Sequence, residues 1–171
     1  QATVTFTAPA STGGSPITGY RVVSTPGNIE ATGSASPITV TGLTNGTSYT
    51  FTVVAINAQG DSVASAPSNA VVPKGTPALS GFADIAKTWG DADFPLTAPT
   101  STSDGAFSYT SSDPAVATIS GNTVTITGVG SAQITANQAE GSAHVAGSIS
   151  ATLTVAKAVP TLTWIPPFSR T

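Results

Sequence analysis

Leu43-Thr-Asn-Gly-Thr-Ser-Tyr49-Thr-Phe-Thr-Val-Val-Ala-Ile-Asn57 is the stretch that decides the fold of this chain. Asn45-Gly46 is a strong turn signal, because both residue types tolerate positive φ. From Tyr49 onward the side chains alternate in character, and a period of two predicts a β-strand with one buried face. We expect Tyr49, Phe51, Val53 and Ala55 on the buried face, and Thr50, Thr52, Val54 and Ile56 on the other.

Leu43 and Tyr49 predict a tyrosine corner, which is a structural feature of Greek-key sandwiches. A tyrosine at the first inward position after a tight turn can bury its ring and return its hydroxyl to the backbone of that turn. The pattern Leu-x5-Tyr-x-Phe-x-Val-x-Ala-x-Asn also resembles strand F of fibronectin type III domains.

The length and composition limit the number of domains and the kinds of reactive or metal site that the chain can form. The 171 residues suffice for two small sandwiches of roughly 75–100 residues each. Only 8% of them are charged, about a third of the usual share, and hydroxyl-bearing and small residues take their place. The chain has no cysteine, which excludes disulfides, thiolate chemistry and cysteine zinc sites. We expect an extracellular protein with a hydroxyl-rich surface.

Charge and hydropathy disfavour two kinds of partner. The net charge is −3 and no basic patch is present, so we expect no nucleic-acid binding. No apolar run approaches the ~20 residues of a membrane span. Residues 1–20 lack the charged start and apolar block of a signal peptide.

Residues 1–73 resemble a bacterial fibronectin type III domain. Strands are expected over 3–7, 18–24, 29–32, 37–41, 49–57 and 62–72, the last interrupted by Pro67, which indicates an edge or a bulge. Besides the Leu43 corner, the resemblance rests on Pro16-Ile17-Thr18-Gly19-Tyr20, Pro37-Ile38-Thr39-Val40, Asn57-Ala58-Gln59-Gly60 and Ala66-Pro67-Ser68.

This resemblance departs from the family pattern in two places. Phe6 stands where the family usually has a tryptophan, and the pattern begins at the second strand of the domain. A sandwich without its first strand exposes an edge and part of its core. Either the sequence was cut from a longer polypeptide, or another chain or another part of this chain supplies the strand.

Residues 74–77 form a Pro/Gly linker, and residues 78–157 predict a second sandwich of short strands with Gly and Asn turns. Residues 115–120 and 123–127 are expected to form a hairpin around Gly121-Asn122. This half resembles bacterial immunoglobulin-like domains of surface proteins. The matching motifs are Tyr109-Thr-Ser-Ser-Asp113-x-x-Val116-Ala-Thr-Ile119, Gly128-x-Gly130-x-Ala132-x-Ile134-Thr135-Ala136 and Lys87-Thr-Trp-Gly-Asp-Ala-Asp-Phe94. The predicted fold class is therefore all-β, with two tandem immunoglobulin-like β-sandwiches.

The tail, residues 158–171, is expected to be extended. It is either the start of a next repeat or a strand donor. The residues of that candidate strand are Thr161, Leu162, Thr163, Trp164 and Ile165.

The sequence offers no catalytic or cofactor site. Asp91 and Asp93, and to a lesser extent Asp84, are weak calcium candidates because hard cations prefer clustered carboxylates. Asp is also common in turns, which is the ordinary structural explanation of these residues. His144 has neither a metal-ligating partner nor a nucleophile beside it in the pattern. We expect no metal, no cofactor and no enzymatic activity.

Four further features have an ordinary structural explanation beside a functional one. Asn45-Gly46-Thr47 fits a glycosylation sequon but is explained by its turn. Lys87 or Lys157 could form an isopeptide bond with an Asp or Asn. The Thr-x-Thr rows could bind ice or glycans, but threonine suits a solvated sheet face. Trp89 and Trp164 could stack on sugar rings but more often pack in cores or interfaces.

Three functions remain open. The first is a structural spacer of a bacterial surface protein of the adhesin-stalk type, whose partners are neighbouring repeats and a cell-surface or glycan ligand. The second is a filament subunit, in which the tail of one chain completes the first sandwich of an identical subunit. The third is an accessory module of a secreted carbohydrate-active enzyme.

Overall fold

A computed structural model describes residues 1–162 and shows that the chain is all-β, with no helix in that range. The predicted fold class is confirmed. The chain divides into two compact units: unit 1 comprises Gln1–Pro77 with Glu140–Val145, and the rest of the described chain forms unit 2. Among the described residues, no helix could cross a membrane.

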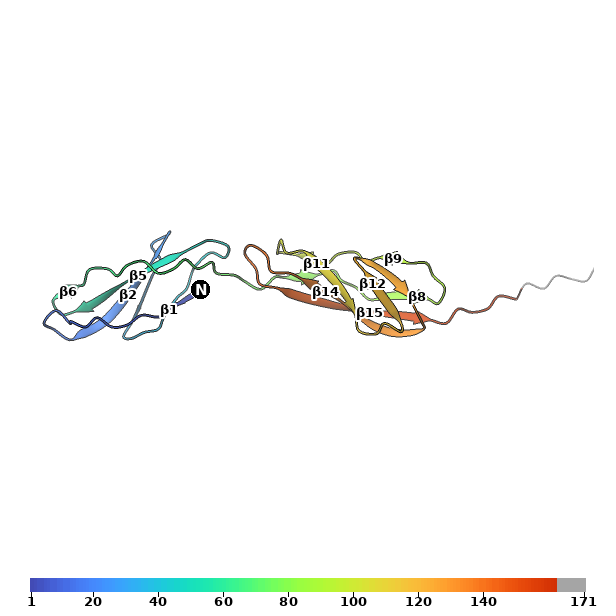
Figure 1. The fold of residues 1–171 in the computed structure, drawn as a ribbon, viewed down its shortest axis with the longest axis horizontal. Coiled ribbons are helices and arrows are strands. Elements are labelled where there is room, and N and C mark those ends of the chain that lie inside the picture. The colour runs from blue at the N-terminus through green and yellow to red at the C-terminus, as the bar shows by residue number, and fades with distance from the viewer. Residues whose placement is uncertain (163–171) are drawn as a thin grey trace, which may run out of the picture. The chain divides into compact units, whose positions relative to one another are not determined.

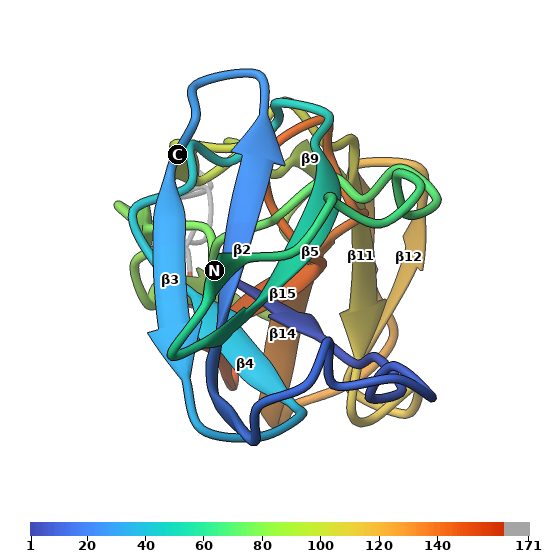
Figure 2. The same cartoon turned by 90° about the vertical axis from the view of Figure 1, so that its left-hand side faces the viewer.

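Unit 1 is built from two sheets (Figure 1). A four-stranded sheet has the order β3-β2-β5-β6, and β1 pairs with β4 in a second sheet. In Figure 2, β3, β2 and β5 lie side by side as one layer. All pairings within unit 1 strands are antiparallel. The strands are β1 (Ala2–Val4), β2 (Ile17–Thr25), β3 (Glu30–Gly33), β4 (Ile38–Val40), β5 (Thr50–Asn57) and β6 (Gly60–Asp61).

The core of unit 1 lies between these two sheets. β2 and β5 contribute one side and β4 the other, because alternate side chains of each strand point to the same face. Val22 and Val40 are completely buried. Further members of the buried cluster are Tyr20, Ile38, Leu43, Tyr49 and Phe51, with Val53 and Ala55 packed against it.

Val54 departs from the predicted alternation. It was expected on the solvent face of β5, yet only 7% of it is exposed. The register places Val54 opposite Arg21 on β2, and a long arginine stem can cover apolar surface on a strand next to it. The outer face of this sheet therefore includes a buried apolar position at Val54.

The strand expected over residues 62–72 is wrong in its regular form. β6 ends before this range, at Asp61, and within the range the one strand-like pairing is the isolated bridge of Val71 to Tyr49. Between them, Ser62, Ser65 and Ser68 repeat one arrangement along β5. Each serine N–H donates to a β5 carbonyl, and each Oγ accepts from the N–H of the same β5 residue, at 2.8–3.0 Å. The β5 partners are Ala55, Val53 and Phe51 in that order.

The side-chain hydroxyl thus takes the place of a strand carbonyl at every third residue. Each hydroxyl also donates to the carbonyl of the following residue, at 2.7–2.9 Å. Pro67 has no N–H to donate to a regular strand ladder. It fits here because the bonds to β5 come from every third residue, and Pro67 is not one of these. We call residues 62–71 the serine-bonded segment.

Replacing Ser65 by alanine is expected to speed hydrogen exchange at the Val53 amide, because that N–H loses its acceptor. The free energy of unfolding should fall by about 0.5–1.5 kcal/mol, the net worth of one hydrogen bond. The Tyr49 amide, which donates to the Val71 carbonyl at 2.8 Å, should keep its protection. Ser48→Ala, a change at an exposed serine, is the control. Unchanged exchange at Val53 in Ser65→Ala would show that the hydroxyl is dispensable.

Unit 2 is a second sandwich with three sheets. The four-stranded sheet has the order β11-β14-β15-β8, the three-stranded sheet has the order β12-β13-β9, and β7 pairs with β10. β8 pairs with β15 in parallel, while the other pairings are antiparallel. The strands are β7 (Leu79–Ser80), β8 (Ile85–Thr88), β9 (Phe94–Pro95), β10 (Thr100–Ser101), β11 (Phe107–Ser111), β12 (Ala117–Ser120), β13 (Thr123–Ile126), β14 (Gly130–Gln138) and β15 (Gly147–Ala156).

The hairpin expected around Gly121-Asn122 is present, with Ser120 opposite Thr123. Ile134, Val124 and Leu153 are completely buried and belong to one cluster that draws on both main sheets. The cluster also contains Leu96, Val116, Ala117, Ala132 and Val155.

A buried glutamine ties a loop to the sheet in unit 2. Gln138 at the end of β14 is 2% exposed. Its Nε2 donates to the carbonyls of Ser103 and Gly105, at 3.1 and 2.8 Å, and its Oε1 accepts from the Ser101 hydroxyl at 2.6 Å. Every polar atom of this amide therefore has a partner, as a buried amide requires.

The tail follows β15. Val159 and Leu162 are 86% and 100% exposed and belong to no strand. Of the candidate strand donor, Thr161 and Leu162 are described, and Thr163, Trp164 and Ile165 lie outside the described residues.

Candidate functional site

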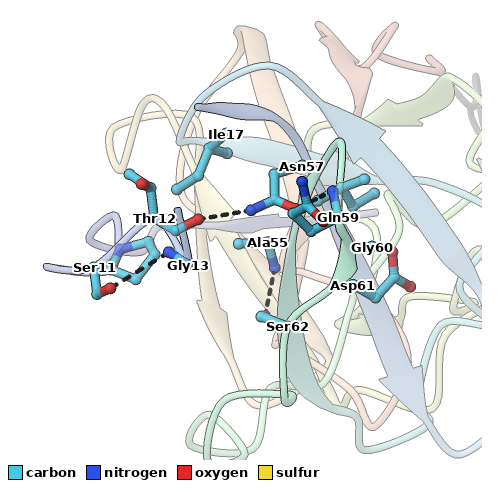
Figure 3. A pocket seen from close by; sticks show the side chains of 12 residues that line it. Ser11, Thr12, Gly13, Ile17, Ala55, Asn57, Gln59, Gly60, Asp61 and Ser62 are labelled. Atoms are coloured by element: carbon cyan, nitrogen blue, oxygen red, sulfur yellow. Dashed lines mark hydrogen bonds between the residues drawn. The ribbon is translucent and has the colours of Figure 1, made fainter. Parts of the chain in front are cut away.

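Two loops of unit 1 enclose a hollow of about 330 Å³ (Figure 3). One loop joins β1 to β2 and contributes Ser11, Thr12 and Gly13; the other is the turn between β5 and β6. Most of the exposed lining is apolar, and Ile17 and Ala55 lie among the lining residues. Loops held by a rigid sandwich are where binding residues concentrate, so this hollow is the candidate binding site of unit 1.

Asn57 fixes the geometry of the hollow. Its Nδ2 donates to the Thr12 carbonyl at 2.6 Å and to the Ser15 carbonyl at 3.4 Å, and its Oδ1 accepts from the Gln59 N–H at 2.8 Å. One side chain therefore ties the first loop to the turn of the second (Figure 3). The sequence placed Asn57 in a turn but gave no sign of the bonds to Thr12 and Ser15.

The charged group at the hollow is already paired. Asp61 Oδ2 accepts from Arg21 Nη2 at 2.6 Å, and Arg21 Nε lies 3.8 Å from Glu30 Oε1. Arg21 Nε has no hydrogen-bond partner although it is buried. Among the residues that line the hollow there is no histidine, lysine or cysteine to activate a hydroxyl. Among these lining residues no nucleophile is paired with a histidine or lysine base.

Replacing Asn57 by alanine is expected to loosen the first loop. The variant removes the donor to Thr12 and Ser15, so amide exchange over residues 11–16 should accelerate. The free energy of unfolding should fall by about 0.5–1.5 kcal/mol, the net contribution expected of a hydrogen bond. Gln59→Ala, at an exposed position in the same turn, should leave the first loop unchanged. Equal exchange in the two variants would contradict the role given to Asn57.

The predicted tyrosine corner residues lie together in unit 1. Leu43 and Tyr49 are 9% and 5% exposed. The Thr44 N–H donates to Tyr49 Oη at 3.1 Å. Tyr49 also exchanges both backbone hydrogen bonds with Val71 at 2.8 Å.

The three aspartates proposed for calcium each accept a hydrogen bond from a different donor in unit 2. Asp84 bonds the Thr152 N–H at 2.7 Å, Asp91 bonds the Thr88 N–H at 2.9 Å, and Asp93 bonds the Thr125 hydroxyl at 2.8 Å. Within residues 1–162, no group of three or more His, Cys, Asp or Glu side chains could hold a metal ion.

The remaining singled-out residues are spread over the chain. Lys87 Nζ lies 4.4 Å from the centre of the Phe94 ring, which is a cation–π geometry. Lys157 is exposed. His144 forms an isolated parallel bridge with Gly75 within unit 1. Trp89 is 46% exposed, and Trp164 lies outside the described residues.

The turn of the glycosylation sequon and the paired threonines Thr3 and Thr39 are solvent-facing. Asn45 is exposed, and the Gly46 N–H donates to the Pro73 carbonyl at 2.9 Å. Thr3 and Thr39 lie opposite each other on β1 and β4, with their hydroxyls 3.5 Å apart.

Residues 1–71 match the family model of the fibronectin type III domain. The match supports a fibronectin type III domain in unit 1. Such domains are typically extracellular, generally non-catalytic modules. No curated protein matches the chain.

Several solved structures are similar to the chain, and two of them are described here. One is the crystal structure of the FN1-FN3 domains of chicken CNTN1, with 17% identity over 89% of this chain and 61% of that chain, at a TM-score of 0.35. The other contains fibronectin(III)-like modules of Clostridium thermocellum CbhA, with 16% identity over 91% of this chain and 85% of that chain, at a TM-score of 0.35.

Proposed function

We propose that the chain is a pair of spacer modules from a bacterial extracellular or cell-surface protein, of the adhesin-stalk type. The observation that carries this proposal is the succession of two sandwiches in one chain, each with its own buried core, the first of which matches the fibronectin type III domain. A spacer needs modules that fold and bear load, and it needs no reactive group.

The surface chemistry is consistent with this function. With 8% charged residues, the modules have few ionic groups whose interactions change with salt. The solvent face of the strands is rich in threonine, which suits a sheet exposed to water. Such modules can separate an outer binding domain from a cell surface without binding partners of their own.

Single-molecule stretching of the full chain tests the proposal. The expected record has two separate unfolding events, each releasing roughly 250 Å, because an extended chain gains at most about 3.3–3.6 Å per residue. A spacer is also expected to show no retention on polysaccharides or host glycans. A single small event, or extension without resistance, would contradict a load-bearing spacer, and glycan binding would favour an accessory module of a carbohydrate-active enzyme.

A further inference from the structure

A hollow of about 420 Å³ lies in unit 2, at the edges of its two main sheets. β8 is the last strand of the four-stranded sheet, and β9 is the last strand of the three-stranded sheet. The two strands do not pair with each other in the described chain, so no ladder joins the sheets there. Ile85 and Lys87 of β8 line the hollow together with Phe94 and Pro95 of β9. Its volume lies within the range of about 300–1,000 Å³ that is usual for small-molecule sites.

The wall of this hollow reaches the core of unit 2. Leu96, which lines the hollow, is 6% exposed and belongs to the buried cluster. Phe82, Ile85 and Phe94 also line it and pack, partly buried, against the same cluster. An apolar ligand body would cover the surface that these side chains still expose and release water from it, which favours binding. Aromatic rings gain further from offset or edge-to-face contact with other rings, so the two phenylalanines favour an aromatic ligand body.

Lys87 supplies a positive charge beside this aromatic surface. Its Nζ lies 4.4 Å from the centre of the Phe94 ring, and none of the ion pairs among residues 1–162 includes Lys87. An ammonium group has three N–H donors, and contact with a ring face leaves donors available to an anion. The other charged lining residue, Asp84, already accepts a hydrogen bond from the Thr152 N–H at 2.7 Å. The hollow therefore combines an apolar wall with a cation that has no ionic partner in the described chain.

We propose that this hollow binds a small aromatic carboxylate. The ring of the ligand lies against Phe82, Ile85 and Phe94, and its carboxylate accepts a hydrogen bond from Lys87 Nζ. Charge-assisted hydrogen bonds are stronger than neutral ones, so this bond gives the ligand its orientation and the site its selectivity. The binding is independent of the spacer function, since modules can separate domains whether the hollow is filled or empty.

An NMR titration of the full chain with 2-naphthoate tests the proposal. Weak binding is expected, with a Kd of about 1 mM, because the probe is small. The largest shifts should occur at the amides of Ile85 and Leu96, and intermolecular NOEs should join the naphthyl protons to the Ile85 methyl groups. The uncharged probe 2-naphthylmethanol should bind about fivefold more weakly, the worth of a partly exposed ion pair. The cationic probe 2-naphthylmethylamine should bind more weakly still, because Lys87 repels it.

Lys87→Met separates the two parts of the site. Methionine keeps an apolar chain beside the Phe94 ring but removes the ammonium group. The affinity for 2-naphthoate should therefore fall about fivefold, to that of 2-naphthylmethanol, while the affinity for the alcohol should stay within about twofold. Lys157→Met is the matched control, because it removes the same charge from unit 2 at an exposed lysine that does not line the hollow. It should leave both affinities within about twofold.

Four results would overturn the proposal. The first is no shift with 2-naphthoate at up to about 10 mM, and the second is equal or tighter binding of the amine. The third is a set of shifts that leaves out the lining residues of this hollow. The fourth is an equal loss of affinity in Lys87→Met and Lys157→Met. The comparison of the three probes on the unchanged chain needs no variant, so it decides the selectivity even if Lys87→Met does not fold.

Discussion

Replacing Ile134 by alanine is expected to lower the free energy of unfolding of unit 2 by about 2–5 kcal/mol, because a buried cavity adds to the lost apolar burial. Ile134 is completely buried. It lies on β14, which pairs with β11 on one side and with β15 on the other. A strand held on both edges cannot move far to fill the space that the isoleucine leaves.

The effect should be confined to unit 2. Amides of β14 and β15 should exchange faster in Ile134→Ala, while those of β2 and β5 keep their rates. Thr118→Ala, an exposed change on β12, should stay within about 0.5 kcal/mol. A loss below 1 kcal/mol in Ile134→Ala, by denaturant unfolding, would show that the core of unit 2 is not packed around this residue.

Replacing Gly128 by alanine is expected to destabilise unit 2 by about 1–3 kcal/mol or more, the cost of overpacking. A Cβ at this position would lie 2.4 Å from the Ala115 carbonyl oxygen. That oxygen is backbone and cannot rotate away as a side chain can. The displaced segment contains Val116, whose carbonyl accepts from the N–H groups of Thr127 and Gly128 at 2.9 and 3.2 Å.

Gly19→Ala is the matched control. Its Cβ would lie 3.5 Å from the Gly33 carbonyl oxygen, an ordinary contact, and Gly19 has no positive φ. This variant should be neutral or stabilising by about 0.4–1 kcal/mol, because alanine restricts the unfolded chain. Thermal unfolding of the two variants should therefore diverge, and similar midpoints would mean that the Ala115 segment yields without resistance.

Structural features that depend only on residues close together in the sequence could be predicted. Strict alternation from Tyr49 predicted a strand with one buried face, and Phe51 is 4% exposed. Asn122 after Gly121 predicted a hairpin, and its register is found. Local chemistry determined both, because a turn residue and a period of two act within a few positions.

The features that escaped prediction depend on distant partners. Val54 is buried although its own period placed it outside, and Arg21, opposite it in the sheet, is far away in sequence. Residues 62–72 are expected to form a strand, yet the serine hydroxyls bind β5 in place of carbonyls. Asn57 reaches Thr12 across the unit, and no local pattern of an asparagine in a turn reveals that acceptor.

The serine-bonded segment has a consequence for aggregation. Sheet edges with regular strands are templates on which identical chains stack without limit, and proteins protect such edges with prolines or irregular backbone. The serine-bonded segment occupies the edge of β5 but has a three-residue period and contains Pro67. A strand from another molecule cannot continue the sheet in regular register on this side. On the β5 side of the sandwich, this irregular edge can therefore prevent identical chains from stacking at high concentration. It can do so although the chain has few charges to keep copies apart.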